Sequence, residues 1–327
     1  MKHVQLETYG APDALRLTET TIPTPKPGEV LLQVHAAGVN YADLLRRRNT
    51  YFAATPLPYV LGSEAVGTVV AAGPGVDAAY GVGTRLLAIL PAGGGYAEYV
   101  AAPAQYCVPL PPSISSADAT AVFVQGTTAQ LMLSHLTPDL AGQTVLVHAA
   151  ASGVGTLLVQ LAKRRGAARI IATASTPEKL ALAAALGADA GVNYTAPDWL
   201  DHVRAANDGR GVDVVFEMVG GEVFNQSLAC LAMGGRMVVY GAASGVQGVV
   251  HSEQLPNQGL SVLGFNLAYY LRELQPLWQE ALATVIGLLA QGALRVETAS
   301  TFALADAAEA HRQIEARHTM GKVVLIP

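Results

Sequence analysis

The chain is poor in the residues that cross-link small secreted folds or hold structural metals. Its 327 residues include only two cysteines, Cys107 and Cys230, which form no closely spaced set. A disulfide framework or a zinc knuckle needs several cysteines at short spacing, so neither is predicted. The eight histidines show no ligand spacing and are expected to be structural or exposed. Both cysteines are expected to be buried small apolar side chains.

Long runs of one residue type are also missing. The formal net charge is −5 and no basic run exceeds Arg46–Arg48, so nothing supports nucleic-acid binding. The longest apolar helical stretch, Ala281–Leu289, is too short to cross a bilayer and is expected to be a core helix. Residues 1–8 contain no apolar signal segment, so a cytoplasmic location without membrane partners is expected.

The most informative segment that is present is Thr144–Gly155. A β-branched apolar run leads into a string of very small residues, and an amphipathic helix pattern follows. A strand that turns tightly into a helix N-terminus forms an anion site, because the first helical N–H groups lack partners and the helix dipole is positive there. Ala150 and Ser152 replace two glycines of the dinucleotide fingerprint, and Gly155 keeps its place. An ordinary tight turn is the alternative.

The segments around this turn favour dinucleotide binding. Apolar runs at 169–174, 191–194, 212–217, 235–241 and 260–265 alternate with helix patterns. One such helix is expected over Pro177–Leu186, with Pro177 in the first turn and Gly187 at the C-cap. Strands that alternate with helices imply parallel βαβ units. We therefore predict an α/β fold with a doubly wound Rossmann domain over residues 123–267.

The end of the second predicted strand bears on cofactor choice. An NAD-specific domain places an acidic residue there to hold the ribose 2′-hydroxyl. This chain has Ala174, Ser175 and Thr176 instead, with Lys179 one turn into the next helix. Hydroxyls and an ammonium attract a 2′-phosphate, so NADPH is favoured over NADH. The alternative is that Lys179 only faces solvent.

The two ends of the chain have a different pattern. The first third is rich in Pro and Gly, with short β-type runs at 30–35, 66–70 and 84–89, which suggests a small β-barrel. The last part alternates again, with a β-type run at 294–297, a helix over 305–316 and a strand at 322–326. We expect residues 1–122 and 268–327 to fold together as one catalytic domain.

With this order of parts, the chain resembles the medium-chain dehydrogenase/reductase superfamily over its full length. Within it, the chain is similar to the zinc-free quinone oxidoreductase (zeta-crystallin-like) family. The blocks that carry the resemblance are Ala36–Asp43, Pro58–Gly67, Gly95–Val100, His148–Gly155, Ala188–Asp189, Asn193–Tyr194 and Gly321. The resemblance implies a GroES-like fold for the β-rich domain.

The positions that bind catalytic zinc in alcohol dehydrogenases of this superfamily carry other residues here. Asn40 stands at the first position, and Ser63 precedes Glu64 where a histidine belongs. No cysteine lies near 124–126, where the third ligand is found, and the lobe with four cysteines is absent. Zinc needs about four N, S or O ligands. No metal site is therefore predicted.

The catalytic residues implied by the resemblance are Asn40 and Tyr51. The Asn40 amide is expected to bond an acceptor oxygen or the cofactor ribose, unless it is only a turn residue. The Tyr51 hydroxyl is expected to polarise a carbonyl oxygen, unless it is only a pocket wall. Asn49 replaces the usual glycine of this block, which leaves the loop geometry open.

The cofactor-binding residues follow the same family pattern. Ser152, Gly153, Val154 and Gly155 are expected to hold the pyrophosphate, and Ser175, Lys179, Tyr194 and Arg317 to face the adenosine and its 2′-phosphate. Thr128, Gly241, Phe265, Asn266 and Leu267 are expected near the nicotinamide.

The resemblance implies a homodimeric NADPH-dependent reductase that acts on a small quinone or enone. A quinone or enone spreads the incoming charge over a conjugated system, so no Lewis acid is needed. Two alternatives stay open. One is an enoyl-thioester or 2-alkenal reductase, whose carrier phosphate Arg46–Arg48 would bind. The other is an NADPH-binding protein with a structural or regulatory role.

Overall fold

The computed structural model describes residues 1–298 and 300–327. They form two compact units, one of residues 1–124 and 286–327 and the other of residues 125–285. The two ends of the chain thus belong to one unit. Our expected division placed residues 268–285 with the chain ends, whereas they lie in the second unit.

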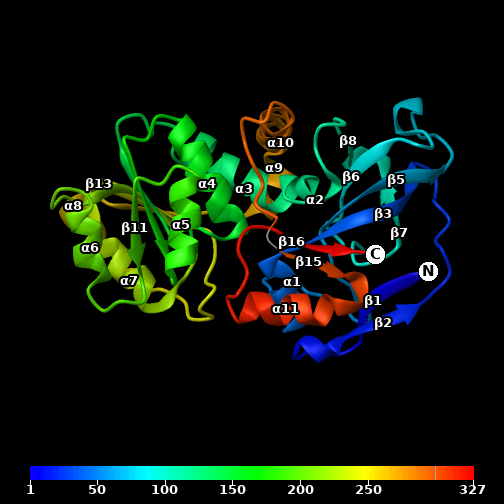
Figure 1. Ribbon diagram of the computed structural model, residues 1–327, viewed down its shortest axis with the longest axis horizontal. Coiled ribbons are helices and arrows are strands. Elements are labelled where there is room, and N and C mark those ends of the chain that lie inside the picture. The colour runs from blue at the N-terminus through cyan, green and yellow to red at the C-terminus, as the bar shows by residue number, and fades with distance from the viewer. Residues whose placement is uncertain (299) are drawn as a thin grey trace. The chain divides into compact units, whose positions relative to one another are not determined.

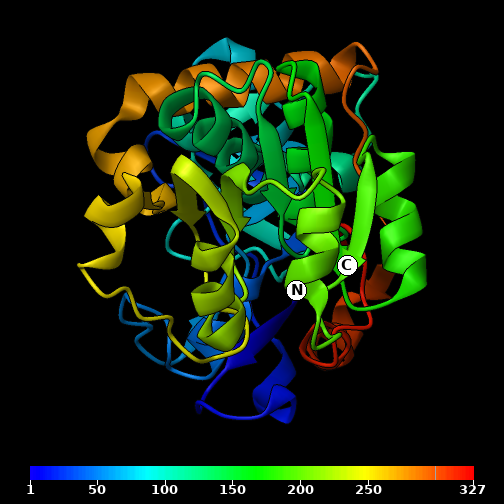
Figure 2. The same cartoon turned by 90° about the vertical axis from the view of Figure 1, so that its left-hand side faces the viewer.

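The second unit is built on a six-stranded parallel sheet (Figures 1 and 2). Its strands lie in the order β11 (Ala190–Asn193), β10 (Arg169–Ala174), β9 (Thr144–Val147), β12 (Val212–Glu217), β13 (Leu231–Val239) and β14 (Ser261–Gly264). The chain proceeds outward from β9 in both directions, so the order reverses between β9 and β12. This is the doubly wound arrangement, and it confirms the predicted Rossmann topology.

Helices cover both faces of this sheet. They are α4 (Gly153–Arg164), α5 (Pro177–Ala185), α6 (Trp199–Ala205), α7 (Gly221–Ala229) and α8 (Gln254–Gln258). A core that includes Leu146, Trp199 and Phe224 packs α6 and α7 against the strands, and α4 and α5 lie on the opposite face (Figure 1).

The two ends of α5 are set by the residues beside them. The Thr176 hydroxyl caps the helix by accepting a hydrogen bond from the Lys179 amide, and Pro177 occupies the first turn, where a missing N–H does no harm. The helix ends before Gly187, whose φ of +111° is one that other residues rarely adopt.

Three further helices are α3 (Thr127–Leu131), α9 (Leu267–Glu273) and α10 (Gln275–Ala290). The predicted core helix is α10, which buries Trp278, Ala281, Leu282 and Val285. Within the described residues, no helix combines the length and apolarity required to span a bilayer.

The first unit contains two sheets. The smaller pairs β2 (Leu15–Glu19), β1 (Lys2–Leu6) and β4 (Tyr59–Val60). The larger has the order β15 (Ser300–Ala303), β16 (Val323–Ile326), β3 (Glu29–Val39), β5 (Glu64–Ala72), β6 (Arg85–Ile89) and β8 (Cys107–Pro109), and β7 (Tyr99–Pro103) also pairs with β3. Helices α1 (Tyr41–Arg47), α2 (Ser116–Ala119) and α11 (Ala307–Glu315) accompany them.

The C-terminal strand joins the two ends of the chain. Strand β16 lies between β15 and β3, and Val324 is paired with Gly38. An apolar core that includes Val34, Leu44 and Leu325 packs inside this unit. The strand predicted at 294–297 is wrong, because the parallel pairing with β16 begins only at Ser300.

Candidate functional site

The turn between β9 and α4 has the geometry of an anion site. Ser152 caps the 12-residue helix α4, and its hydroxyl accepts a hydrogen bond from the Gly155 amide at 3.1 Å. Ala149 adopts a φ of +48°, which is uncommon for a residue with a side chain. The turn therefore presents the helix N-terminus and small side chains, as an anion requires.

The two glycines of this turn are needed for close packing. A Cβ atom at Gly155 would overlap the carbonyl oxygen of Ala149, and one at Gly153 would overlap the Gln125 amide. Gly153, Val154 and Gly155 form the first turn of α4. These features fit the pyrophosphate of a dinucleotide, which Ser152 and the first N–H groups of α4 would hold.

The strand ends beside this turn bring some of the predicted adenosine residues together. Ser175 follows β10, and the Tyr194 amide donates a 3.3 Å hydrogen bond to the carbonyl of Ala174 at the end of that strand. Lys179 lies in the first turn of α5. Sequence reasoning overlooked Glu178, which lies in the same turn and brings a negative charge beside Lys179. Hydrogen bonds from the backbone and Thr176 lower the pKa of Glu178.

The predicted nicotinamide residues lie at the other strand ends of this sheet. Gly241 follows β13, and the Phe265 amide donates to the Val239 carbonyl at 2.9 Å. Asn266 caps α9 by accepting a hydrogen bond from the Ala268 amide at 2.9 Å, and Leu267 opens that helix. Ligands of open α/β sheets bind at these carboxyl ends.

Thr128 lies elsewhere in this unit, buried within α3. Arg317 belongs to the other unit, where it follows α11 with a φ of +58°. The role of each toward a cofactor stays a prediction.

Asn40 lies at the centre of a buried polar cluster in the first unit. Its Nδ2 donates to Glu64 Oε1 at 2.6 Å, and its Oδ1 accepts from Lys322 Nζ at 3.2 Å. Lys322 Nζ also lies 2.6 Å from Glu64 Oε1. The three residues are at most 4% exposed. An ammonium among these side chains repels a cation, so the donor set does not fit a zinc ion.

A second buried polar cluster surrounds Asp43, which lies in the first turn of α1. Asp43 accepts hydrogen bonds from the Asn40 amide at 2.9 Å, the Gly62 amide at 3.2 Å and the Tyr96 hydroxyl at 3.2 Å. Tyr96 Oη lies 3.1 Å from His311 Nε2. Burial raises the pKa of Asp43 to about 6. Asp43 thus fixes the backbone of Asn40 and closes the capping box of α1.

Tyr51 lies half-buried against a guanidinium group. The Cζ atom of Arg46 is 4.2 Å from the centre of the Tyr51 ring and 5.7 Å from that of Tyr59. Burial raises the pKa of the Tyr51 hydroxyl, so this group donates a hydrogen bond more readily than a proton. Asn49 adopts a φ of +56°, which asparagine tolerates, so it supplies a left-handed conformation without a glycine.

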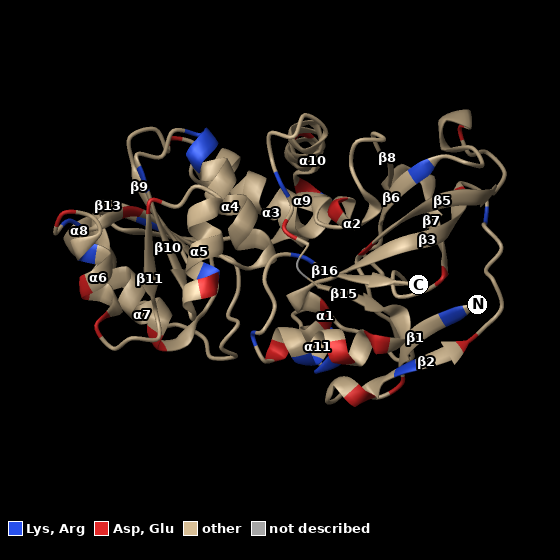
Figure 3. Ribbon diagram, in the orientation of Figure 1, with Lys and Arg blue, Asp and Glu red and all other residues tan. Residues whose placement is uncertain are grey.

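The side chains of the arginine run Arg46–Arg48 make contacts within their own unit. Arg46 lies over Tyr51 and donates to Thr55 Oγ1 at 3.2 Å. Arg47 is buried and pairs with Glu315, and Arg48 lies 2.6 Å from the same carboxylate. Acidic and basic residues also alternate along α11 (Figure 3). Two of the three guanidinium groups thus share one carboxylate.

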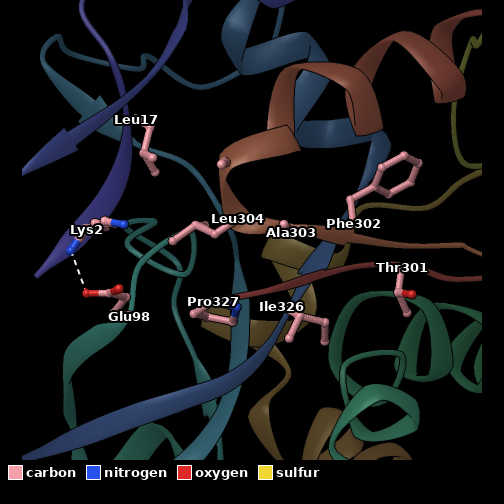
Figure 4. Close-up of a pocket in the computed structure, with 10 residues that line it drawn as sticks. Lys2, Leu17, Glu98, Thr301, Phe302, Ala303, Leu304, Ile326 and Pro327 are labelled. Atoms are coloured by element: carbon pink, nitrogen blue, oxygen red, sulfur yellow. Dashed lines mark hydrogen bonds between the residues drawn. The ribbon is translucent and has the colours of Figure 1, made fainter.

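An open groove of about 490 Å³ lies beside the C-terminus. It is lined by residues of β1, β2, β15 and β16, with apolar side chains such as Leu17, Phe302 and Ile326, and the Lys2 amide donates to Glu98 at its edge (Figure 4). None of the predicted site residues lines it, so it gives no support to a catalytic role.

In the described part of the chain, no three His, Cys, Asp or Glu side chains are grouped so that they could hold a metal ion. Cys107 and Cys230 are free and buried, as predicted.

Comparison with known proteins places the chain in a family. Residues 26–112 match the family model described as alcohol dehydrogenase GroES-like domain, and residues 153–286 match the one described as zinc-binding dehydrogenase. A quinone oxidoreductase of Pseudomonas aeruginosa is 36% identical over 327 residues, which cover 100% of this chain and 99% of that protein. A 2-haloacrylate reductase of a Burkholderia species is 34% identical and covers 97% and 96%.

The same similarity extends to solved structures. The Escherichia coli quinone oxidoreductase in complex with NADPH superposes with a TM-score of 0.92 at 31% identity, over 100% of both chains. The resemblance drawn from the sequence blocks is confirmed. The chain belongs to the quinone oxidoreductase family of the medium-chain dehydrogenase/reductase superfamily, with a GroES-like and a Rossmann fold.

Proposed function

We propose that this protein reduces quinones or other conjugated carbonyl compounds with NADPH and without a zinc ion. The observation that carries the proposal is the buried Asn40 amide, which donates to Glu64 and accepts from Lys322. An ammonium–carboxylate pair offers hydrogen bonds but no Lewis acid, which suits an acceptor that delocalises charge.

The binding of NADPH is supported by the turn at Ser152–Gly155 and by the NADPH complex of the related Escherichia coli enzyme. When bound, the nicotinamide ring supplies the hydride. The chain's own residues hold the cofactor through the N-terminus of α4, and Ser175 and Lys179 would face the 2′-phosphate.

The acceptor would be polarised by two hydrogen-bond donors. The Asn40 amide nitrogen carries a second hydrogen beyond the one bonded to Glu64, and the Tyr51 hydroxyl is a further donor. The name of the 2-haloacrylate reductase among the relatives supports an activated alkene as one acceptor class. The buried and paired Arg47 argues against the enoyl-thioester alternative, since it leaves fewer free charges for a carrier phosphate.

We also propose a homodimer and a cytoplasmic location. Strand β14 is the last strand of its sheet, and an apolar strand left as an open edge favours uncontrolled pairing. Pairing of this edge with a second copy across a two-fold axis closes the sheet.

A panel of acceptors tests the proposed reaction. NADPH oxidation is followed by the loss of nicotinamide absorbance with benzoquinones, naphthoquinones, 2-alkenals and enoyl-CoA, and with NADH as control. We expect turnover with quinones or enals and a preference for NADPH. Activity confined to enoyl-CoA would replace this proposal with the enoyl-thioester reductase.

A further inference from the structure

Lys322 and Glu64 form a buried ion pair in the first unit. Lys322 precedes β16, Glu64 opens β5 and Asn40 follows β3, so three distant segments meet at one point. The side chains of both Lys322 and Glu64 are 0% exposed. Burial of an ion pair carries a desolvation penalty that often cancels the attraction, so this pair is weak evidence for a role in stability alone.

The backbone leaves space for this pair. A Cβ atom at Gly38 would overlap Glu64 Oε1 and would lie 2.5 Å from Lys322 Nζ. Gly38 is paired with Val324 across β3 and β16. Because glycine has no side chain, this pairing leaves the space that the Lys322–Glu64 ion pair occupies. The position of the pair is thus built into the sheet that joins the two ends of the chain.

The pair determines which way the Asn40 amide faces. The ammonium has only donors and therefore selects Oδ1, while the carboxylate Oε1 accepts and therefore selects Nδ2. The Asn40 backbone amide is held separately by Asp43. With these contacts in place, one amide hydrogen of Asn40 is directed at Glu64 and the other is directed away from it.

We propose that Lys322 and Glu64 are positioning residues, which fix the Asn40 amide so that its second N–H is presented to the acceptor carbonyl oxygen. The ammonium on Oδ1 also polarises the amide and strengthens that N–H as a donor. This inference rests on the proposed function for the identity of the acceptor. The orientation of the amide does not depend on it.

A double-mutant cycle tests the proposal. The variants are Lys322→Met, Asn40→Ala and the two combined, with Lys163→Met as control, because Lys163 makes a 2.7 Å ion pair with Asp189 in the other unit. We expect Lys322→Met and Asn40→Ala each to lower kcat roughly tenfold to a hundredfold, in line with one weakened oxyanion donor, with the Kd for NADPH unchanged. The combined variant should be no slower than Asn40→Ala.

The outcomes that would overturn the proposal are equally direct. Losses that multiply in the combined variant, or an unchanged kcat in Lys322→Met, would show that Lys322 does not act through Asn40. If Lys322→Met does not fold, the uncharged double variant Lys322→Met/Glu64→Gln replaces it. The amide oxygen of the glutamine placed at position 64 can still accept a hydrogen bond from Asn40. A positioning role predicts that this double variant restores stability but not kcat, whereas recovery of both would contradict it.

A measurement without turnover separates this proposal from the proposed function. In protein labelled with ¹⁵N at asparagine, the Asn40 side-chain amide is assigned by its loss in Asn40→Ala. We expect two well-separated, slowly exchanging amide protons that merge toward solvent values in Lys322→Met. Unchanged resonances in Lys322→Met would overturn the positioning role. A wild-type protein that reduces no acceptor would instead refute the proposed function.

Discussion

The guanidinium of Arg46 lies over the ring of Tyr51, with Cζ 4.2 Å from the ring centre. This contact holds the ring through its face, and the Tyr51 hydroxyl oxygen also accepts a hydrogen bond from Arg46. Replacing Tyr51 with Phe removes the hydroxyl and keeps the ring, so mutation separates the two contributions.

Tyr51→Phe should lower kcat by about tenfold to a hundredfold, because it removes one donor to the acceptor while the ring contact with Arg46 remains. Steady-state kinetics with a quinone give this value. Tyr59→Phe is the matched control, since Arg46 also lies over that ring at 5.7 Å, and it should change kcat by less than about twofold. Equal losses in both variants would assign the effect to packing.

Lys179→Ala should weaken NADPH binding by about 1–3 kcal/mol, roughly a fivefold to 150-fold rise in Kd, and should leave NADH binding almost unchanged. Glu178→Gln should do the reverse and tighten NADPH binding, because Glu178 places a negative charge in the same helical turn. Fluorescence titration measures both constants. Equal affinities of the wild type for NADPH and NADH would refute the assignment of this turn to the 2′-phosphate.

The open edge of β14 predicts a dimer. Light scattering at micromolar concentration should give about twice the chain mass of 33.9 kDa. A mass equal to that of one chain would leave the edge of β14 without the proposed partner and would contradict this part of the account.

The buried His148 should make the protein sensitive to acid. It bridges Thr173 Oγ1 and Ser227 Oγ at 2.8 Å each, and burial lowers its pKa from 6.5 to about 3. Below pH 6.5 the unfolded chain binds a proton at this site and the folded chain does not. Stability from this group is therefore present above pH 6.5 and is lost as the pH falls toward 3, at about 1.4 kcal/mol per pH unit.

Chemical denaturation of the wild type and of His148→Gln at about pH 7 and about pH 5 measures this effect. The variant should lose roughly 2 kcal/mol less than the wild type between these two pH values. His311 and Asp43 titrate in both proteins, so the difference isolates His148. Parallel pH dependences would show that His148 titrates normally in the fold.

Much of the Rossmann unit could be predicted from the sequence because its signals are local. The strands 169–174 and 212–217 begin and end where expected, since β-branched runs there lie between polar residues and glycines. The limits of α5 follow from Pro177 and Gly187 in the same way.

The polar cluster of Asn40 could not be predicted because its contacts are not local. Lys322 lies 282 residues from Asn40 in the chain, and they meet only because β16 pairs with β3. The sequence shows Lys322 only as a residue before a strand. The lack of a side chain at Gly38 becomes informative only once the pairing of β16 with β3 is known.

The arginine run is continuous in the sequence, but the helix separates its members. Successive residues of an α-helix point about 100° apart, so Arg46 faces Tyr51 while Arg47 is buried toward Glu315. Arg46 therefore lies apart from Arg47 and Arg48, which share the Glu315 carboxylate.

The central claim is reduction of a conjugated carbonyl by NADPH without a metal. The most direct measurement is quinone turnover by protein whose zinc content is determined in the same sample, before and after treatment with a chelator, beside ethanol oxidation with NADP⁺. We expect quinone turnover that is unchanged by the chelator at well below one zinc ion per chain, with no ethanol oxidation. Turnover that follows the zinc content, or ethanol oxidation without activity on any quinone or enone, would contradict it.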